Sequence, residues 1–253
     1  MAETSAQAAL HPALRIGIPV DSRRVAVIVP AFREAENLPE LIQRLDALRV
    51  APHCLDLELI IVNDESGDNS ESVIAGANQP WARIVTRTTE RGLSSAVIHG
   101  LRLARHPYFV VMDADLSHPP EAIPLLIAAL EGGAEFAVGS RYVPGGSTDD
   151  QWTLFRAMNS RVATALARPL TNLKDPMSGF FALRRETFGR AAPLNPVGYK
   201  IGLELLVKCR CKQVREVPIH FASRKRGESK LTFKEQVRYL RHLWRLMMFK
   251  IRG

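Results

Sequence analysis

Two aspartates, Asp113 and Asp115, are the side chains in this sequence best suited to hold a metal ion. They follow an apolar run with β-branched residues, 108–112, which predicts a buried strand. In an extended chain, side chains two residues apart point to the same side, and neighbouring carboxylates repel unless a cation lies between them. Carboxylate oxygens suit Mg²⁺ or Mn²⁺, and such a cation could carry a diphosphate. The alternative is a pair of loop acids that begin the helix predicted over residues 121–130.

The elements that must position these acids alternate between strand and helix. β-branched and apolar runs predict strands, whereas apolar residues at a spacing of three to four predict helices. Strands are expected over residues 25–29, 57–62, 83–86 and 214–221, and helices over 34–48, 70–77, 94–105 and 201–212. This alternation predicts an α/β fold, with a mostly parallel sheet covered by helices on both faces.

Polar clusters follow three of the predicted strands, at residues 30–34, 63–68 and 113–117. Ligands of parallel α/β sheets bind beyond the carboxyl ends of the strands, so the three clusters are expected to form one site. Turn and cap chemistry is the alternative for each cluster taken alone. The sequence contains neither G-x-G-x-x-G after the first strand nor a P-loop, so a metal is expected to hold the diphosphate.

Composition limits the class and location of the protein. Its 253 residues are 46% hydrophobic, enough for a sizeable core. The three cysteines form no CxxC pair, which favours a reducing compartment. No apolar stretch is long enough to span a membrane, and the N-terminus lacks the pattern of a signal peptide. We expect a flexible leader at residues 1–23, a catalytic domain at 24–231 and an amphipathic helix at 232–253.

The net charge of +8 is concentrated after residue 199, where 15 Lys and Arg face only 4 acids. Nucleic acid, an anionic membrane or a phosphorylated lipid could each attract such a segment. The segment lacks the interleaved aromatic residues of single-strand binding platforms, and no helix-turn-helix or zinc pattern occurs. A nucleic-acid partner is therefore not expected, and a non-catalytic nucleic-acid-binding module is the remote alternative.

Six motifs in order along the chain resemble family 2 glycosyltransferases of the GT-A fold, which is Rossmann-like. Residues 29–37, 62–68, 113–120 and 139–142 carry the family resemblance, and residues 175–180 and 224–230 are similar to its dolichol-phosphate mannosyltransferase (polyprenol monophosphomannose synthase) branch. The resemblance implies inverting transfer of mannose from GDP-mannose to a polyprenyl (dolichyl) phosphate, with Mg²⁺ or Mn²⁺ as cofactor. A transferase that uses UDP-glucose or another UDP-sugar is the alternative.

The resemblance also implies roles for individual residues. Asp113, Asp115 and Ser117 correspond to metal-binding positions. The nucleotide sugar is expected to contact the following residues, of which Asp115, Arg141, Arg224 and Lys230 would be catalytic: Pro30, Phe32, Glu34, Val62, Asp64, Asp113, Ala114, Asp115, Ser117, Arg141, Arg224 and Lys230. Arg33 and Asn63 depart from the family pattern (Asn and Asp), which leaves guanine and uracil both open.

This chemistry requires positive charge rather than a general base. A phosphate monoester is already ionised near neutral pH, so it can attack the sugar without deprotonation. Arg141, Arg224 and Lys230 would hold phosphates of the donor or the acceptor. Residues 224–230 could also be an ordinary solvated basic loop.

Two further residues have expected positions. His118 is expected beside the acids without binding the metal. Glu204 is either a surface residue or the acid of a Tyr-x-x-x-x-Glu segment.

The last predicted helix carries an apolar stripe beside a row of basic residues. The stripe comprises Phe233, Val237, Leu240, Trp244, Met247 and Ile251, and the basic row comprises Lys234, Arg238, Arg241 and Arg245. The stripe could dock on the core, or it could lie on an anionic membrane surface. We expect the second arrangement, with the protein peripheral to the cytosolic face of a membrane, alone or with a membrane-protein partner.

Overall fold

A computed structural model of the protein describes residues 24–149, 162–195, 200–223 and 233–252. The predicted leader at residues 1–23 lies outside this part of the chain. Seven strands form the central sheet in the order β3-β2-β1-β4-β7-β5-β8. Their bounds are β1 Arg24–Ala31, β2 Asp56–Asn63, β3 Ala82–Thr86, β4 Tyr108–Val111, β5 Phe136–Ser140, β7 Phe181–Arg184 and β8 Val214–Pro218. Only β7 is antiparallel to its neighbours, so the predicted mostly parallel sheet is confirmed.

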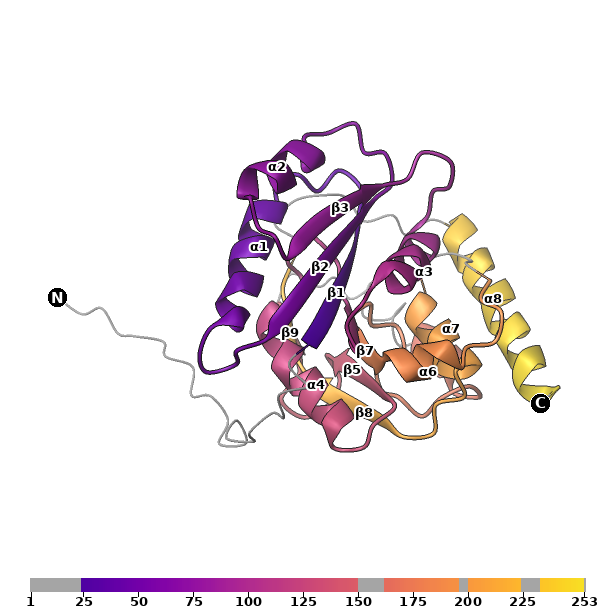
Figure 1. Ribbon diagram of the computed structural model, residues 1–253. Helices are drawn as coiled ribbons and strands as arrows, with labels where there is room; N and C mark the ends of the chain where they lie inside the picture. Colours follow the sequence, from indigo (N-terminus) through magenta and orange to yellow (C-terminus); the bar gives the residue numbers. More distant parts are fainter. Residues whose placement is uncertain (1–23, 150–161, 196–199, 224–232, 253) are drawn as a thin grey trace.

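Helices cover both faces of the sheet, as predicted (Figure 1). One face carries α1 Leu38–Asp46, α2 Ser70–Ala77 and α4 Ile123–Glu131, and the other carries α3 Leu93–Leu103, α6 Arg185–Gly189, α7 Ile201–Lys208 and α8 Phe233–Ile251. Two 3-10 turns, Ala47–Arg49 and Pro120–Ala122, adjoin α1 and α4. The β-branched residues of β1 and β2 alternate between the two apolar clusters, because successive strand side chains point to opposite faces. Both strands therefore pack against apolar side chains on both faces of the sheet.

The strand predicted over residues 214–221 is divided in two, which corrects the prediction. β8 ends at Pro218, and His220–Phe221 forms β9, which pairs with β6 (Ser147–Thr148) in a separate small sheet. Proline has no backbone N–H, so it cannot donate to a continuing ladder. The predicted helix over 201–212 is also shorter, because Arg210 adopts a left-handed conformation (φ 54°) just after α7.

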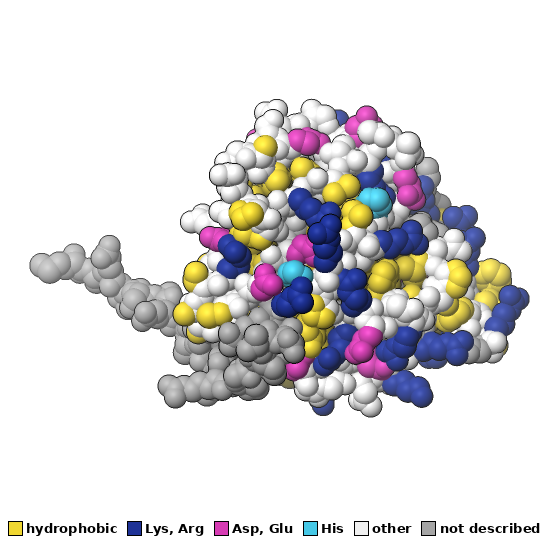
Figure 2. Space-filling view, viewed as in Figure 1, with side chains coloured by type: hydrophobic (Ala, Val, Ile, Leu, Met, Phe, Trp, Pro, Cys, Tyr) yellow, Lys and Arg dark blue, Asp and Glu magenta, His cyan; other side chains and the backbone are white. Residues whose placement is uncertain are grey.

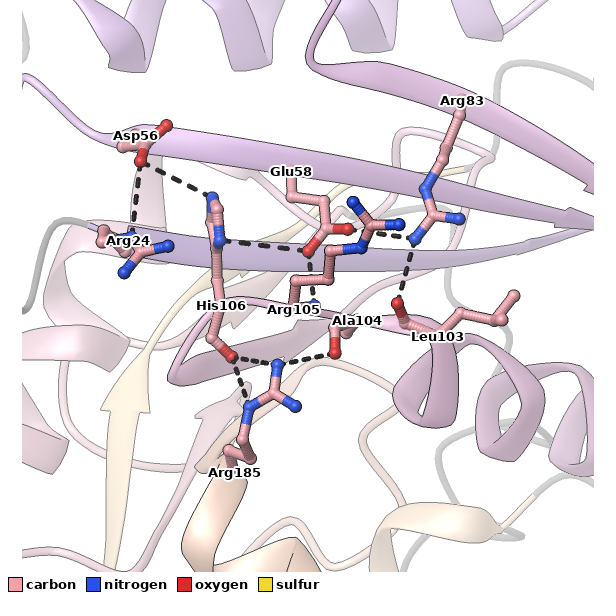
Figure 3. Close-up of polar contacts among 9 residues, drawn as sticks. All are labelled: Arg24, Asp56, Glu58, Arg83, Leu103, Ala104, Arg105, His106 and Arg185. Atoms are coloured by element: carbon pink, nitrogen blue, oxygen red, sulfur yellow. Dashed lines mark hydrogen bonds and ion pairs between the residues drawn. The ribbon is translucent and has the colours of Figure 1, made fainter.

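A polar network closes the sheet edge at which β1 and β2 begin (Figure 3). Glu58 accepts hydrogen bonds from Arg83 Nη2 and from the Arg105 backbone N–H. Arg185, at the start of α6, donates to the carbonyl oxygens of Ala104 and His106. The network thus ties β2, β3 and α6 to the turn between α3 and β4, at the edge remote from the three predicted polar clusters.

Candidate functional site

The loops after β1 and β2 are joined to each other at the carboxyl edge of the sheet. Ser66 Oγ accepts the Arg33 backbone N–H at 2.9 Å, and Asp68 Oδ2 accepts that of Ala35 at 3.1 Å. Burial would raise the pKa of Asp68, but hydrogen bonds from Ser70 and Ala35 outweigh it and lower the pKa. Two of the three predicted polar clusters therefore form one connected wall.

Asp64 and Arg87 form a buried ion pair beside this wall. Arg87 Nε donates to Asp64 Oδ1 at 2.8 Å and Arg87 Nη1 donates to Ser95 Oγ at 3.0 Å. The other Asp64 oxygen accepts the Gly92 backbone N–H at 2.7 Å. Asp64 therefore anchors the segment between β3 and α3. The sequence does not identify Arg87 as a site residue, because nothing in its spacing relates it to Asp64.

The paired aspartates follow β4, but not as an extension of the strand. β4 ends at Val111, and Leu116 has a positive φ of 62°, so the acids lie in a bend. The acids therefore do not lie in extended strand, which corrects the local geometry assumed in the prediction. Asp115 is 4% exposed and its Oδ1 accepts the Ser117 backbone N–H at 3.1 Å, whereas the side chain of Asp113 is 29% exposed. Asp115 is thus buried in the bend, and Asp113 is partly exposed.

His118 fixes the position of Asp113. Its Nδ1 accepts the Asp113 backbone N–H at 3.1 Å, and its ring stacks on Phe180 with centroids 5.3 Å apart. Burial lowers the pKa of His118, although the charges of Asp113 and Asp115 oppose the shift. A neutral ring can accept this hydrogen bond, which the protonated form cannot.

The donor set at the bend suits a hard divalent cation. Asp113 and Asp115 offer carboxylate oxygens, and buried Ser117 Oγ has no hydrogen-bond partner within the described chain. Mg²⁺ and Mn²⁺ prefer oxygen ligands and complete their coordination with water or phosphate oxygens. The described ranges contain no group of three or more His, Cys, Asp or Glu placed to hold a metal, so the two acids would depend on such additional ligands.

Arg141 lies at the end of β5, in a bidentate pair with Asp175. Its Nε and Nη2 each donate to a different Asp175 oxygen at 2.7 Å. Burial alone would lower the pKa of Arg141, but the bond and the charge of Asp175 outweigh it, so that the pKa rises. Glu216 in turn accepts the backbone N–H groups of Lys174 and Asp175. The predicted phosphate-binding arginine is therefore held by an acid to which the sequence assigned no role.

The other residues predicted to contact the nucleotide sugar differ in their exposure. The side chains of Val62 and Ala114 are buried in the apolar clusters, so any contact of Val62 with a nucleoside would come from its main chain. Phe32 is 37% exposed and Pro30 and Glu34 are half-buried at the end of β1, on the wall. Arg224 and Lys230 lie outside the described residues. Glu204 is buried, so the expectation of a surface residue is wrong; its Oε1 accepts the Asn195 backbone N–H and pairs with Lys208.

A lysine that the sequence gave no reason to select, Lys200, lies near the acids. It precedes α7, and its Nζ donates to the Met177 carbonyl oxygen at 3.2 Å. Burial lowers the pKa of Lys200 to about 8; the charge of Arg141 adds to the shift, and those of Asp175 and Asp113 oppose it. These four charged groups, with Asp115, form the polar centre of the candidate site.

α8 docks on the core mainly through residues outside the predicted stripe, of which only Met247 among the described side chains takes part. His242, Leu243 and Leu246 are buried against the second apolar cluster, and Tyr239 and Met247 pack beside them. Val237, Leu240, Trp244 and Ile251 are 50 to 72% exposed. Figure 2 shows Lys and Arg side chains among hydrophobic ones on the α8 side of the molecule. Among the described helices, none combines the length and apolar character needed to cross a membrane.

Comparisons with known proteins agree on the family. The sequence model of the family described as "Glycosyl transferase family 2" matches residues 26–190. The chain is 44% identical to a dolichol-phosphate mannosyltransferase of Pyrococcus furiosus, over 90% of this chain and 64% of the relative, so that it spans less than two thirds of that protein. It is 44% identical to a dolichol-phosphate mannosyltransferase of Saccharomyces cerevisiae, over 89% and 87% of the two chains.

More distant relatives extend the comparison. A polyprenol monophosphomannose synthase of Mycolicibacterium smegmatis is 33% identical over 83% of this chain and 82% of the relative. Among solved structures, a glucosyl-3-phosphoglycerate synthase of Mycobacterium tuberculosis, in complex with Mn²⁺, UDP and glucosyl-3-phosphoglycerate, is similar with a TM-score of 0.66. That likeness covers 90% of this chain and 80% of the other, at 20% identity, and shows a shared fold.

Proposed function

Because this chain belongs to glycosyl transferase family 2, we propose that it is a mannosyltransferase that moves mannose from GDP-mannose to a polyprenyl phosphate. The observation that carries the proposal is the 44 to 46% identity to three dolichol-phosphate mannosyltransferases, over about nine tenths of this chain. The domain that performs the reaction is assigned to residues 24–231.

The wall formed by the loops after β1 and β2 is the proposed nucleoside subsite. Asp64 and Arg87 support this wall as a buried pair whose groups bond to each other, to Ser95 and to Gly92, so the pair gives no preference between guanine and uracil. The names of the relatives give mannose as the sugar and print no nucleotide. GDP-mannose is therefore proposed from the resemblance of the sequence motifs.

The reaction proposed at the carboxyl edge is a single in-line displacement that inverts the sugar. Asp113, Asp115 and Ser117 would hold Mg²⁺ or Mn²⁺, which, when bound, offsets the charge that develops on the leaving diphosphate. The acceptor phosphate is ionised near neutral pH, so no residue needs to remove a proton. Arg141, Arg224 and Lys230 are assigned to phosphates because two anions must approach the same sugar carbon.

A panel of radiolabelled GDP-mannose, UDP-glucose and UDP-GlcNAc with a polyprenyl phosphate tests this function. We expect labelled product from GDP-mannose alone, and none in the presence of EDTA. Transfer only from a UDP-sugar would contradict the donor, and transfer unaffected by EDTA would contradict the metal. Thermal stabilisation by GDP with Mn²⁺, absent with EDTA, would support donor binding independently of the acceptor.

We also propose that α8 lies on an anionic membrane surface, where the lipid acceptor resides. The support is the exposed apolar row Val237, Leu240, Trp244 and Ile251, with exposed arginines at 241 and 245. Apolar side chains flanked by arginines suit the boundary between headgroups and acyl chains. We propose, with this assignment, a position peripheral to the cytosolic leaflet, with or without a membrane-protein partner.

A further inference from the structure

The first turn of α7 packs directly on the segment that precedes β7. A Cβ atom on Gly202 would lie 3.0 Å from the Phe181 ring and 3.5 Å from the Ser178 carbonyl oxygen. A Cβ on Gly179, in the same segment, would lie 3.5 Å from both carboxylate oxygens of Asp113. The segment that contains Ser178 and Gly179 therefore lies against both α7 and Asp113.

Lys200 is carried into this space by α7. Its Nζ is anchored on the Met177 carbonyl, in the same segment, at 3.2 Å. The charges of Asp113, Asp175 and Arg141 all act on its ammonium group. An ammonium has three N–H donors and can bind more than one oxygen acceptor. The structure thus provides an anchored cation whose charge interacts with that of Asp113.

The local charges show why a cation is needed there. The Arg141 guanidinium is offset by the Asp175 carboxylate, so this pair adds no net charge to the site. The cation held by Asp113 and Asp115 would be committed to the donor diphosphate. A phosphate monoester near pH 7 carries a charge of about −1.5 to −2. A further cation, in addition to the assigned Arg141, Arg224 and Lys230, would reduce the repulsion between such an acceptor and the bound diphosphate.

We propose that Lys200 is a catalytic residue that binds the phosphate group of the acceptor. The proposal rests on the proposed function, because it takes the acceptor to be a phosphate monoester. Lys200 would hold the attacking phosphate near the sugar carbon and reduce its repulsion from the donor. It would do so as a point charge, without transferring a proton.

The test uses Lys200→Met, Lys200→Gln and Lys200→Arg in the full chain, with GDP-mannose, Mn²⁺ and a short-chain isoprenyl phosphate. We expect the neutral variants to lower kcat/KM for the acceptor by about 10- to 100-fold, the usual range for losing a charge-assisted hydrogen bond. The KM for GDP-mannose and the thermal shift with GDP and Mn²⁺ are expected to stay within about twofold. Lys200→Arg restores part of the loss. Lys200→Gln can still donate to the Met177 carbonyl, so the test does not depend on the folding of Lys200→Met.

Lys174→Met is the matched control, because Lys174 is an exposed lysine directly before Asp175. Its acceptor kinetics are expected to equal those of the wild type. An unchanged acceptor kcat/KM in the neutral Lys200 variants would overturn the assignment, and so would loss of the GDP shift with an unchanged acceptor KM. If the wild type transfers sugar to no isoprenyl phosphate at all, the proposed function itself fails.

Discussion

Arg141 and Asp175, 34 residues apart in the chain, face each other as a guanidinium and a carboxylate with two parallel hydrogen bonds of 2.7 Å. Asp175 also accepts the Arg141 backbone N–H at 3.1 Å, so one carboxylate fixes both the main chain and the side chain of the arginine. Asp175 is fully buried, and Arg141 lies over the Phe221 ring. The pair therefore couples the end of β5 to the segment before β7.

Removing the acid of this pair is expected to destabilise the protein strongly. Asp175→Ala leaves the buried guanidinium without its partner, which costs about 3–5 kcal/mol in comparable buried pairs. Urea unfolding at pH 7 measures the change. Glu186→Ala is the control, since Glu186 pairs with Arg184 only at 3.9 Å and its side chain is 77% exposed; a change below about 0.5 kcal/mol is expected. Equal effects of both substitutions would show that Asp175 has no special role.

Removing one of the paired aspartates is expected to abolish transfer and leave the fold intact. Asp115→Ala deletes a proposed metal ligand and relieves repulsion with Asp113. We expect activity at least a thousandfold below wild type, and no thermal shift with GDP and Mn²⁺. Asp56→Ala, at the opposite edge of the sheet and with a 64% exposed side chain, is the control and should retain activity. Turnover by Asp115→Ala would contradict the metal assignment.

Gly146 is expected to tolerate no side chain. A Cβ atom there would lie 2.6 Å from the Ser140 carbonyl oxygen and 2.8 Å from the Arg141 carbonyl, so Gly146→Ala must displace the main chain of the paired arginine. A loss of about 1–3 kcal/mol in unfolding free energy and a reduced kcat are expected. Gly76→Ala in α2, with no atom within 4 Å of its Cβ, should instead stabilise by about 0.5–1 kcal/mol. Thermal unfolding and initial rates on both variants check the contrast.

The exposed row of α8 is expected to control membrane binding without affecting stability. Leu240→Ser with Trp244→Ser should lower co-sedimentation with anionic vesicles at least tenfold, because each side chain would bury apolar surface in the interface. The unfolding midpoint should hardly change, since both are more than half exposed. Leu243→Ser, at a 4% exposed position, should reduce stability by about 2–4 kcal/mol. Undiminished vesicle binding by the double variant would refute the surface assignment.

Elements with a repeated hydrophobic pattern can be predicted from the sequence. Contacts between residues that are distant in the sequence cannot. The β-branched runs of β1 and β2 and the heptad-like spacing of α1 each indicate their own structure. β5 and β7 were not anticipated, because short strands of five and four residues carry little pattern and a sheet neighbour is not encoded locally. The division after β8 was missed because Pro218 was read as part of a continuous strand.

The same limit applies to the candidate site. The acids at 113 and 115 were recognised because their spacing is local. The partners Arg87 of Asp64 and Asp175 of Arg141 lie 23 and 34 residues away in sequence. Lys200 reaches the acids only through the packing of α7 on the segment before β7. The buried face of α8 could not be predicted either. Tyr239, His242 and Leu246, on the buried face, are spaced along the helix as regularly as the exposed apolar row.

The insertion of β7 between β4 and β5 has a consequence for biosynthesis. β4 makes no ladder with β5, and Tyr108 pairs with Arg184, 76 residues further along. A nascent chain that has emerged only through β5 therefore carries the group β3-β2-β1-β4 and an unpaired β5. The two join once residues 181–184 have left the ribosome, so that productive folding waits for most of the polypeptide to be synthesised.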